Sequence, residues 1–234
     1  MSDITFTIDG TTYRSEPGRT ILAAAKANGV YIPTLCNYEG LKPVGTCRIC
    51  TVRVGGRYMA ACTSILAAGM EIENIVADLE DMRRSIVEML FVEGNHLCPS
   101  CEKSGNCELQ ALGYRYRIMV PRFPYQFPRR EIESVAPKIL MDRNRCVLCL
   151  RCVRAIESED GRKIFFPVNR GHEKKIGVDA ALASELSEEA ARRAMDICPV
   201  GSILRKEVGF AVPIGQRRFD GSPIGSDVDG DIPR

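Results

Sequence analysis

The cysteines of this chain fall into groups of four when one histidine is added to them. The sequence holds eleven cysteines and two histidines. All the cysteines and one histidine divide into a first set (Cys36, Cys47, Cys50, Cys62), a second set (His96, Cys98, Cys101, Cys107) and a third set (Cys146, Cys149, Cys152, Cys198). Four soft donors at such spacings are typical of iron–sulfur ligation. The sequence therefore predicts three iron–sulfur clusters.

Disulfides and structural zinc are the alternatives for so many cysteines. The start, MSDITFTIDG, has neither the basic nor the apolar region of a secretory signal, and an odd number of cysteines does not suit a disulfide framework. Zinc sites also use C-x2-C pairs. The third set, however, has C-x2-C-x2-C spacing and a Pro directly after Cys198, as in bacterial ferredoxins. Iron–sulfur clusters are therefore favoured over zinc.

Residues 1–78 predict a small α+β domain around the first set. ITFTIDG and TTYR predict two strands, RTILAAAKANG has helical composition, and ICTVRVGGRYMAAC predicts two further strands around a Gly-Gly pair. This is a β-grasp ferredoxin pattern, and the spacing C-x10-C-x2-C-x11-C predicts a 2Fe-2S cluster. Gly45 and Thr46 precede the central cysteine pair, where backbone N–H groups can turn toward a cluster. An ordinary turn explains Gly45 equally well.

Residues 79–118 predict a small helical domain that holds a 4Fe-4S cluster. Apolar residues recur at a spacing near 3.6 from residue 79 to Gly94, which predicts an amphipathic helix leading to His96. The C-x2-C-x5-C run supplies three thiolates, and the imidazole of His96 is the favoured fourth ligand. Water or the carboxylate of Glu93 or Glu102 is the alternative, with His96 beside the cluster or on the surface.

The remainder of the chain predicts a linker, a third domain and a tail. Residues 119–137 mix Pro, Arg and aromatic side chains and predict an extended strap across a subunit surface, with an RNA-binding strap as the weaker alternative. Residues 138–210 resemble a bacterial ferredoxin module with one 4Fe-4S cluster, in whose loops His172 is expected to be solvated. Residues 211–234 predict a docking or disordered tail.

Charge and missing motifs exclude several classes of function. The chain has 32 basic and 30 acidic residues, and no basic domain or helix-turn-helix accompanies the cysteines, which disfavours a nucleic-acid-binding protein. No apolar run approaches the roughly 18 residues that span a membrane. Neither G-x-G-x-x-G nor G-x4-G-K-[ST] occurs, so no nucleotide site is expected. No catalytic residue is predicted, and the clusters are expected to carry electrons between partner proteins.

The order of the three sets resembles that of a known family. It is similar to the amino-terminal part of the large iron–sulfur subunit of respiratory complex I and to the accessory region of iron-only hydrogenases, although those relatives place the histidine at H-x3-C and this chain has H-x-C. The stretch EGNHLCPSCEKSG, residues 93–105, most resembles the diaphorase iron–sulfur subunit of cytoplasmic NAD-reducing NiFe hydrogenases. The resemblance spans residues 1 to about 212.

This resemblance implies a set of partners and cofactors. It implies a cytoplasmic electron-relay subunit of an oxidoreductase, placed between a flavin/NAD-binding diaphorase subunit and the small and large NiFe hydrogenase subunits. FMN, NAD and the NiFe centre are then expected on those partners only. An NAD-dependent formate dehydrogenase or a complex I-like assembly is the alternative within the same class. A sensor or nucleic-acid-binding protein that uses its clusters structurally is the alternative from a different class.

Overall fold

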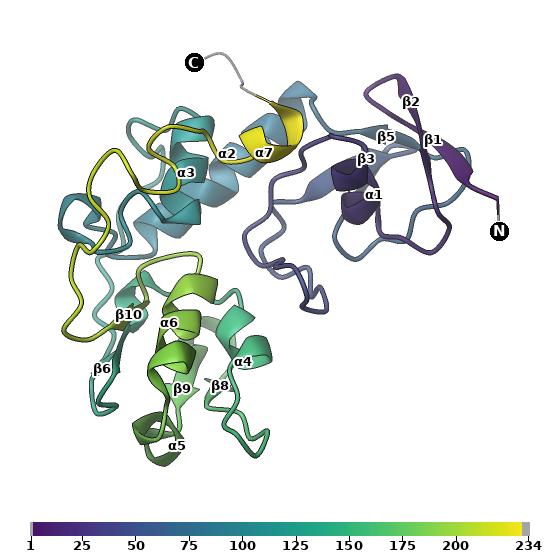
Figure 1. The fold of residues 1–234 in the computed structure, drawn as a ribbon. Helices are drawn as coiled ribbons and strands as arrows, with labels where there is room; N and C mark the ends of the chain where they lie inside the picture. Colours follow the sequence, from purple (N-terminus) through teal and green to yellow (C-terminus); the bar gives the residue numbers. More distant parts are fainter. Residues whose placement is uncertain (1, 231–234) are drawn as a thin grey trace.

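The computed structural model describes residues 2–230 as three small units (Figure 1). The first unit holds a five-stranded sheet, the second a pair of helices, and the third two small sheets with helices beside them. The protein is therefore α+β. No helix in residues 2–230 has both the length and the apolar character that a membrane span needs.

The first unit is a mixed sheet with one helix packed on it. Its strands lie in the order β2-β1-β5-β3-β4, in which the β1–β5 pair is parallel and the other pairs are antiparallel. The strands are β1 (Ile4–Ile8), β2 (Thr11–Ser15), β3 (Thr51–Val54), β4 (Arg57–Ala60) and β5 (Glu71–Glu73). Helix α1 (Ile21–Ala27) is capped by Thr20, whose hydroxyl accepts a hydrogen bond from the Ala23 amide. Alternate residues Phe6 and Ile8 of β1 enter the core beneath this helix.

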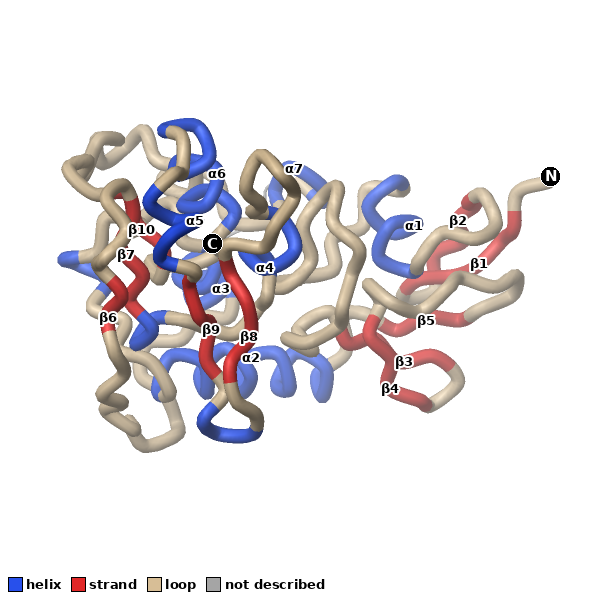
Figure 2. Tube along the Cα trace, turned by 90° about the horizontal axis from the view of Figure 1, so that it is seen from below, coloured by secondary structure: helices blue, strands red, loops and turns tan. Residues whose placement is uncertain are grey.

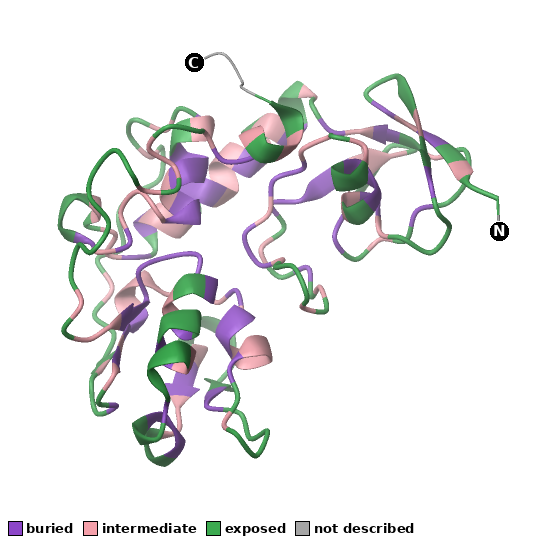
Figure 3. Ribbon diagram, in the orientation of Figure 1, coloured by how far each residue is buried: buried purple, intermediate pink, exposed green. Residues whose placement is uncertain are grey.

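The second unit is built from two helices and the loop between them. Helix α2 (Ala77–Val92) runs from the first sheet to α3 (Glu108–Arg115), and a 3-10 turn at Cys98–Ser100 lies between the two helices. Figure 3 shows the buried faces of α2 and α3 against each other. Gly113 permits this contact, since a Cβ there would lie 3.1 Å from the Phe91 ring. The packing fixes the cysteine loop against the end of α2.

The third unit combines two small sheets with three helices. Its first sheet has the order β10-β7-β6, and β8 and β9 form an antiparallel pair beside it (Figure 2). The strands are β6 (Ile132–Glu133), β7 (Ile139–Asp142), β8 (Phe165–Val168), β9 (Lys175–Val178) and β10 (Ile203–Arg205), and the helices are α4 (Arg151–Ala155), α5 (Ala180–Ser184) and α6 (Glu188–Ile197). The hydroxyl of Ser187 caps the start of α6.

The predicted strap runs over the outer face of α2. Arg122 donates hydrogen bonds to Glu88 at 2.7 Å and to Asp81 at 2.7 Å, both on α2. The amide of Gln126 donates to the carbonyl of Val92. Several apolar side chains of this segment remain exposed, among them Met119.

The C-terminal tail packs along the second unit, although its composition also allowed a disordered segment. It passes α3 and ends in α7 (Ser226–Asp229), shown in yellow in Figure 1. Arg115 of α3 donates to the Ile224 carbonyl at 2.8 Å and to Asp229 at 2.9 Å. Gly225, at φ +94°, lies against the ring of Tyr31 in the first unit. The tail therefore contacts two units at once; its last residues, 231–234, lie outside the described part of the chain.

Candidate iron–sulfur sites

The four cysteines of the first set meet in one cluster of sulfurs. Cys36, Cys47 and Cys50 lie on the loop between α1 and β3, and Cys62 follows β4. The neighbouring thiols of Cys47 and Cys62 hold the pKa of Cys36 well below the ordinary value. The neighbouring Cys62 thiol lowers the pKa of Cys50 to about 7. Each sulfur therefore lies within hydrogen-bonding reach of another, and neighbouring thiolates of this kind suit a bound cluster.

The loop around the first set needs unusual backbone conformations. Gly45 has φ +65° and Arg48 has φ +60°, and a Cβ at Gly45 would lie 3.3 Å from the Thr63 side chain. The side chain of Thr46 is close enough to the Cys36 thiol to lower its pKa further. Gly45 is thus part of a tight turn, and Thr46 lies beside a candidate ligand.

The three cysteines of the second set come together at the start of α3. Cys98 begins the 3-10 turn and Cys101 directly follows it, while the Cys107 sulfur accepts a hydrogen bond from the Gln110 amide at 3.4 Å. Burial, and after it the charges of Cys101 and Cys98, raise the pKa of Cys107 to about 12. Burial and the Cys101 charge also raise the pKa of Cys98. The three thiols therefore share one buried site.

His96 lies beside this site, with its ring against the end of α2. The imidazole packs edge-on to Phe91 with 5.6 Å between ring centroids, and its Nε2 lies 2.3 Å from where a Cβ of Gly94 would be. Burial lowers the pKa of His96 to about 4, so the ring is neutral at physiological pH, and a neutral imidazole is the form that binds metals. None of the described contacts joins this ring to a cysteine. Ligation by His96 therefore stays a prediction. The other histidine, His172, is 95% exposed in its side chain.

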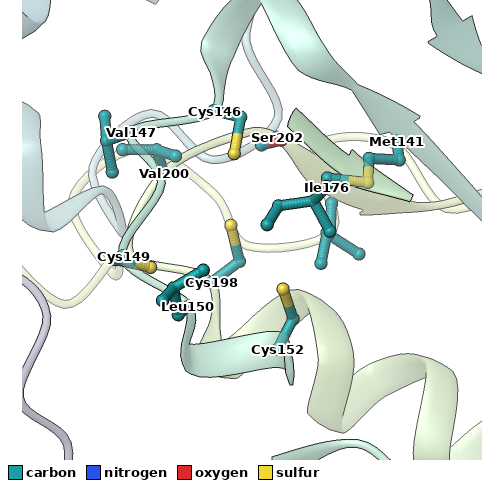
Figure 4. A pocket seen from close by; sticks show the side chains of 11 residues that line it. Met141, Cys146, Val147, Cys149, Leu150, Cys152, Ile176, Cys198, Val200 and Ser202 are labelled. Carbon is teal, nitrogen blue, oxygen red and sulfur yellow. The ribbon is translucent and has the colours of Figure 1, made fainter. Parts of the chain in front are cut away.

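The four cysteines of the third set surround a small apolar cavity (Figure 4). Cys146 and Cys149 lie on the loop that leads into α4, Cys152 is the second residue of that helix, and Cys198 follows α6. The apolar lining is made by Met141, Val147, Leu150, Ile176, Val200 and Ile203. Burial, with the charges of the neighbouring thiols, raises the pKa of Cys146 to about 11 and of Cys149 to about 12. The Ser202 hydroxyl, which lines the same cavity, donates its hydrogen bond to the carbonyl of Asp142 at 2.9 Å.

The loop of the third set is strained in a way that fits a ligand loop. Leu148 has φ +51° and Leu150 has φ +60°, a left-handed conformation that is uncommon for residues other than glycine. Such a conformation persists only where surrounding structure enforces it, and it is concentrated at functional sites. Here it turns three cysteines at C-x2-C-x2-C spacing toward one point.

The described residues fit clusters better than single metal ions. Among residues 2–230, no group of three or more His, Cys, Asp or Glu side chains is arranged to hold one ion. In a 4Fe-4S cluster each ligand binds a different iron atom, so the ligands stand farther apart than those of one ion. The buried Nε of Arg151, next to Cys152, has no hydrogen-bond partner in the described part of the chain. A buried cationic donor of this kind is suited to an anionic cluster.

The second and third sites are in direct contact, which no sequence motif indicated. Arg145, next to Cys146, points its Nη1 at the Cys101 sulfur, 3.6 Å away. A Cβ on Gly201 would lie 2.4 Å from that same sulfur. The amide of Glu108 donates to the carbonyl of Pro199 at 2.8 Å. The paired residues are 44 or more positions apart in the chain, so only the folded chain reveals these contacts.

Comparisons with known proteins match the chain to iron–sulfur families. Three family models match in chain order: a 2Fe-2S iron–sulfur cluster binding domain at residues 2–75, the NADH-ubiquinone oxidoreductase-G iron–sulfur binding region at 83–122, and the ferredoxin-like domain of NADH-quinone oxidoreductase subunit 3 at 136–204. The mitochondrial 78 kDa subunit of NADH-ubiquinone oxidoreductase from Candida albicans is 30% identical over 90% of this chain, which corresponds to 29% of that longer protein.

Two relatives match over nearly their whole length. The gamma subunit of the NAD-reducing hydrogenase HoxS from Cupriavidus necator is 50% identical over 93% of both chains. A chain in the crystal structure of an NAD+-reducing [NiFe]-hydrogenase in the H2-reduced state is 39% identical, with a TM-score of 0.88 over 98% of this chain and 99% of that one. The chain therefore belongs to the family of iron–sulfur gamma subunits of NAD-reducing hydrogenases.

Proposed function

We propose that this subunit relays electrons through one 2Fe-2S and two 4Fe-4S clusters between a flavin/NAD-binding diaphorase subunit and the small and large subunits of a NiFe hydrogenase. The first set would hold the 2Fe-2S cluster in a β-grasp domain. The second and third sets would hold the 4Fe-4S clusters, with His96 as the one ligand that is not a cysteine. The clusters would supply one-electron carriers, and FMN, NAD and the NiFe centre would belong to the partners.

The contact of the third site with both other sites is the observation that carries this proposal. Arg145 and Gly201 join it to the second site. Arg154 of α4 donates to the carbonyls of Cys36 at 2.7 Å and Cys149 at 3.4 Å, and so joins the third site to the first. Three sites in contact in one chain form a continuous series, which an electron relay needs and a single structural cluster does not.

Purification from the native host, followed by metal and flavin analysis, tests the partners. Nickel and flavin in the purified assembly would support the hydrogenase, whereas molybdenum or tungsten would point to a formate dehydrogenase. A complex with neither metal, in which NADH reduces a quinone, would favour a complex I-like assembly. Recovery of the chain bound to nucleic acid, with none of these partners, would overturn the relay.

Replacement of Cys198 tests whether the third cluster lies on the path. In the assembled complex, Cys198→Ala should abolish hydrogen-driven NAD reduction and leave NADH-driven dye reduction at the flavin largely intact. Ser184→Ala, an exposed change on α5 of the same unit, should leave both activities unchanged. Full hydrogen-driven activity in the Cys198→Ala complex would show that electrons bypass the third site.

A further inference from the structure

One buried arginine contacts residues next to cysteines of all three sets. Arg151 directly precedes Cys152 of the third set, and its Nη1 lies 3.4 Å from the carbonyl of Ile197, the residue before Cys198. Nη1 and Nη2 also donate to the Glu108 carboxylate at 2.8 and 2.6 Å. Glu108 follows Cys107 of the second set. Nη2 donates in addition to the carbonyl of Asn37 at 2.8 Å, and Asn37 follows Cys36 of the first set. We call Arg151, Glu108, Asn37 and Ile197 the Arg151 junction.

The Arg151 junction buries two charged side chains, which close packing of the protein interior does not require. Arg151 is 2% exposed and Glu108 is 8% exposed. Removing two charges from water is costly, and apolar side chains of similar size would fill such a space equally well or better. The guanidinium group also lies over the Tyr38 ring, 5.2 Å from its centroid. A planar group with five donors can satisfy partners on several loops at once, and lysine cannot reproduce that geometry.

Helix α4 carries a second arginine with a related role. Arg154, one turn after Arg151, donates to the carbonyls of Cys36 and Lys42 at 2.7 and 2.6 Å. Two side chains of one short helix therefore hold the loop of the first set against the third unit. Of these two arginines, only Arg151 also reaches the second set, through the side chain of Glu108.

We propose that Arg151 is a positioning residue that holds the three sites together and, with Glu108, sets their reduction potentials relative to one another. This inference rests on the proposed relay function. Each one-electron reduction adds a negative charge to a cluster, so a nearby buried cation stabilises the reduced form and a nearby buried anion destabilises it. The third site should respond most, because Arg151 directly precedes one of its cysteines and contacts the residue before another.

Redox titration of the assembled complex, followed by electron paramagnetic resonance, tests the proposal. Arg151→Gln removes the buried partner of Glu108 and leaves it only the exposed Arg218, 3.8 Å away, so the midpoint potential of the third cluster should fall. Glu108→Gln leaves the arginine uncompensated, so the same potential should rise. We expect each shift to change the one-electron equilibrium at least tenfold, which corresponds to about 59 mV. The other two clusters should shift in the same direction but by less.

Three further variants separate charge from structural damage. Arg162→Gln removes the same charge from an exposed loop of the third unit and should move no potential. Arg151→Lys keeps the charge but loses the bidentate contact with Glu108. The midpoint potential of the third cluster should therefore stay close to that of the unaltered protein, while the contacts between the sites should weaken. The double variant Arg151→Gln/Glu108→Gln should give potentials between those of the single variants. If Arg151→Gln does not assemble, the midpoint potentials of Arg151→Lys and Glu108→Gln are compared instead.

The possible outcomes distinguish this proposal from the relay itself. Opposite shifts in the two single variants, with full iron content, would support the role of Arg151, because loosened structure alone has no reason to reverse sign between them. Unmoved potentials, or shifts of the same sign, in complexes with three intact clusters would overturn that role and leave the relay standing. A native complex without three reducible clusters would contradict the proposed function instead.

Discussion

Gly201 lies where the loop after Cys198 meets the sulfur of Cys101. A Cβ at this position would lie 2.4 Å from that sulfur, closer than two non-bonded atoms approach, and Cys101 is itself buried. Gly201→Ala should therefore displace Cys101 and destabilise the second cluster, with a loss of about four irons per chain. Iron analysis after anaerobic purification measures this.

Gly209 provides the matched control for that substitution. It carries no left-handed backbone angle, and no atom lies within 4 Å of a Cβ built there. Gly209→Ala should keep full iron content. Equal iron in the two variants would mean that the contact between Gly201 and Cys101 is not needed to hold the second cluster.

His96 provides a second test at the residue scale. If its imidazole is a ligand, His96→Ala should make the second cluster labile, whereas His96→Cys should keep the cluster at a lower reduction potential, because thiolate carries more negative charge than imidazole. His172→Ala, at the exposed histidine, is the control and should change neither property. Unchanged iron content and spectra in His96→Ala would show that this histidine is not a ligand.

The residues that sequence reasoning missed have no local pattern to reveal them. The cysteines of each set are marked by their spacing, and the structure brings together all four of the first set, the three of the second and all four of the third. Arg145, Arg151 and Gly201 act on partners more than forty residues away, so no motif contains both members of a pair. Nothing in a sequence distinguishes a buried arginine from the many that are solvated.

At the scale of elements, strands with close partners were predictable and strands with distant partners were not. The hairpins β1–β2 and β3–β4 have alternating residues around turn glycines, and each pairs with its neighbour in the chain. The strand β5 spans three residues and pairs with β1, which is more than sixty residues earlier. The pair β7 and β10 is separated by a similar distance. Such short segments have too few residues for a periodic pattern, and tertiary pairing decides their conformation.

Arg115 holds the C-terminal tail against α3, so its replacement should release the tail. Its guanidinium group binds the Ile224 carbonyl and Asp229 and lies 4.3 Å from the centroid of the Tyr31 ring. Arg115→Met should release residues 211–230, raise their cleavage by protease, and lower the free energy of unfolding by about 1–3 kcal/mol. Arg117→Met, at an exposed arginine two residues on, is the control.

Peptide mapping of the first cleavage sites, with a denaturant titration, measures both effects. Early cuts confined to the tail of Arg115→Met, and absent from Arg117→Met, would agree with the structure. Identical cleavage of the two variants would mean that other contacts are sufficient to hold the tail, such as the hydrogen bond between the Phe219 amide and the Gly105 carbonyl.

At the scale of the whole molecule, the three units are joined by an apolar core that they share, by the buried ion pair between Arg151 and Glu108, and by loops that carry the cysteines. The cysteine loops of different units also bind one another directly through arginine side chains. The state of one cluster can therefore affect the geometry around the next. Loss of a single cluster should weaken the joints between units as well as one site.

The iron content of the whole chain is the most direct test of this arrangement. One 2Fe-2S and two 4Fe-4S clusters predict about ten irons per chain and a brown colour in anaerobically prepared protein. Iron and acid-labile sulfide should be present in equal amounts, and a chelator under denaturing conditions should remove both. About six irons would eliminate one 4Fe-4S cluster, and a further loss of four irons in Gly201→Ala and His96→Ala would then identify the third cluster as the absent one. Stoichiometric zinc with no visible absorption would instead mean that the cysteines form structural zinc sites, and no electron path would remain in the chain.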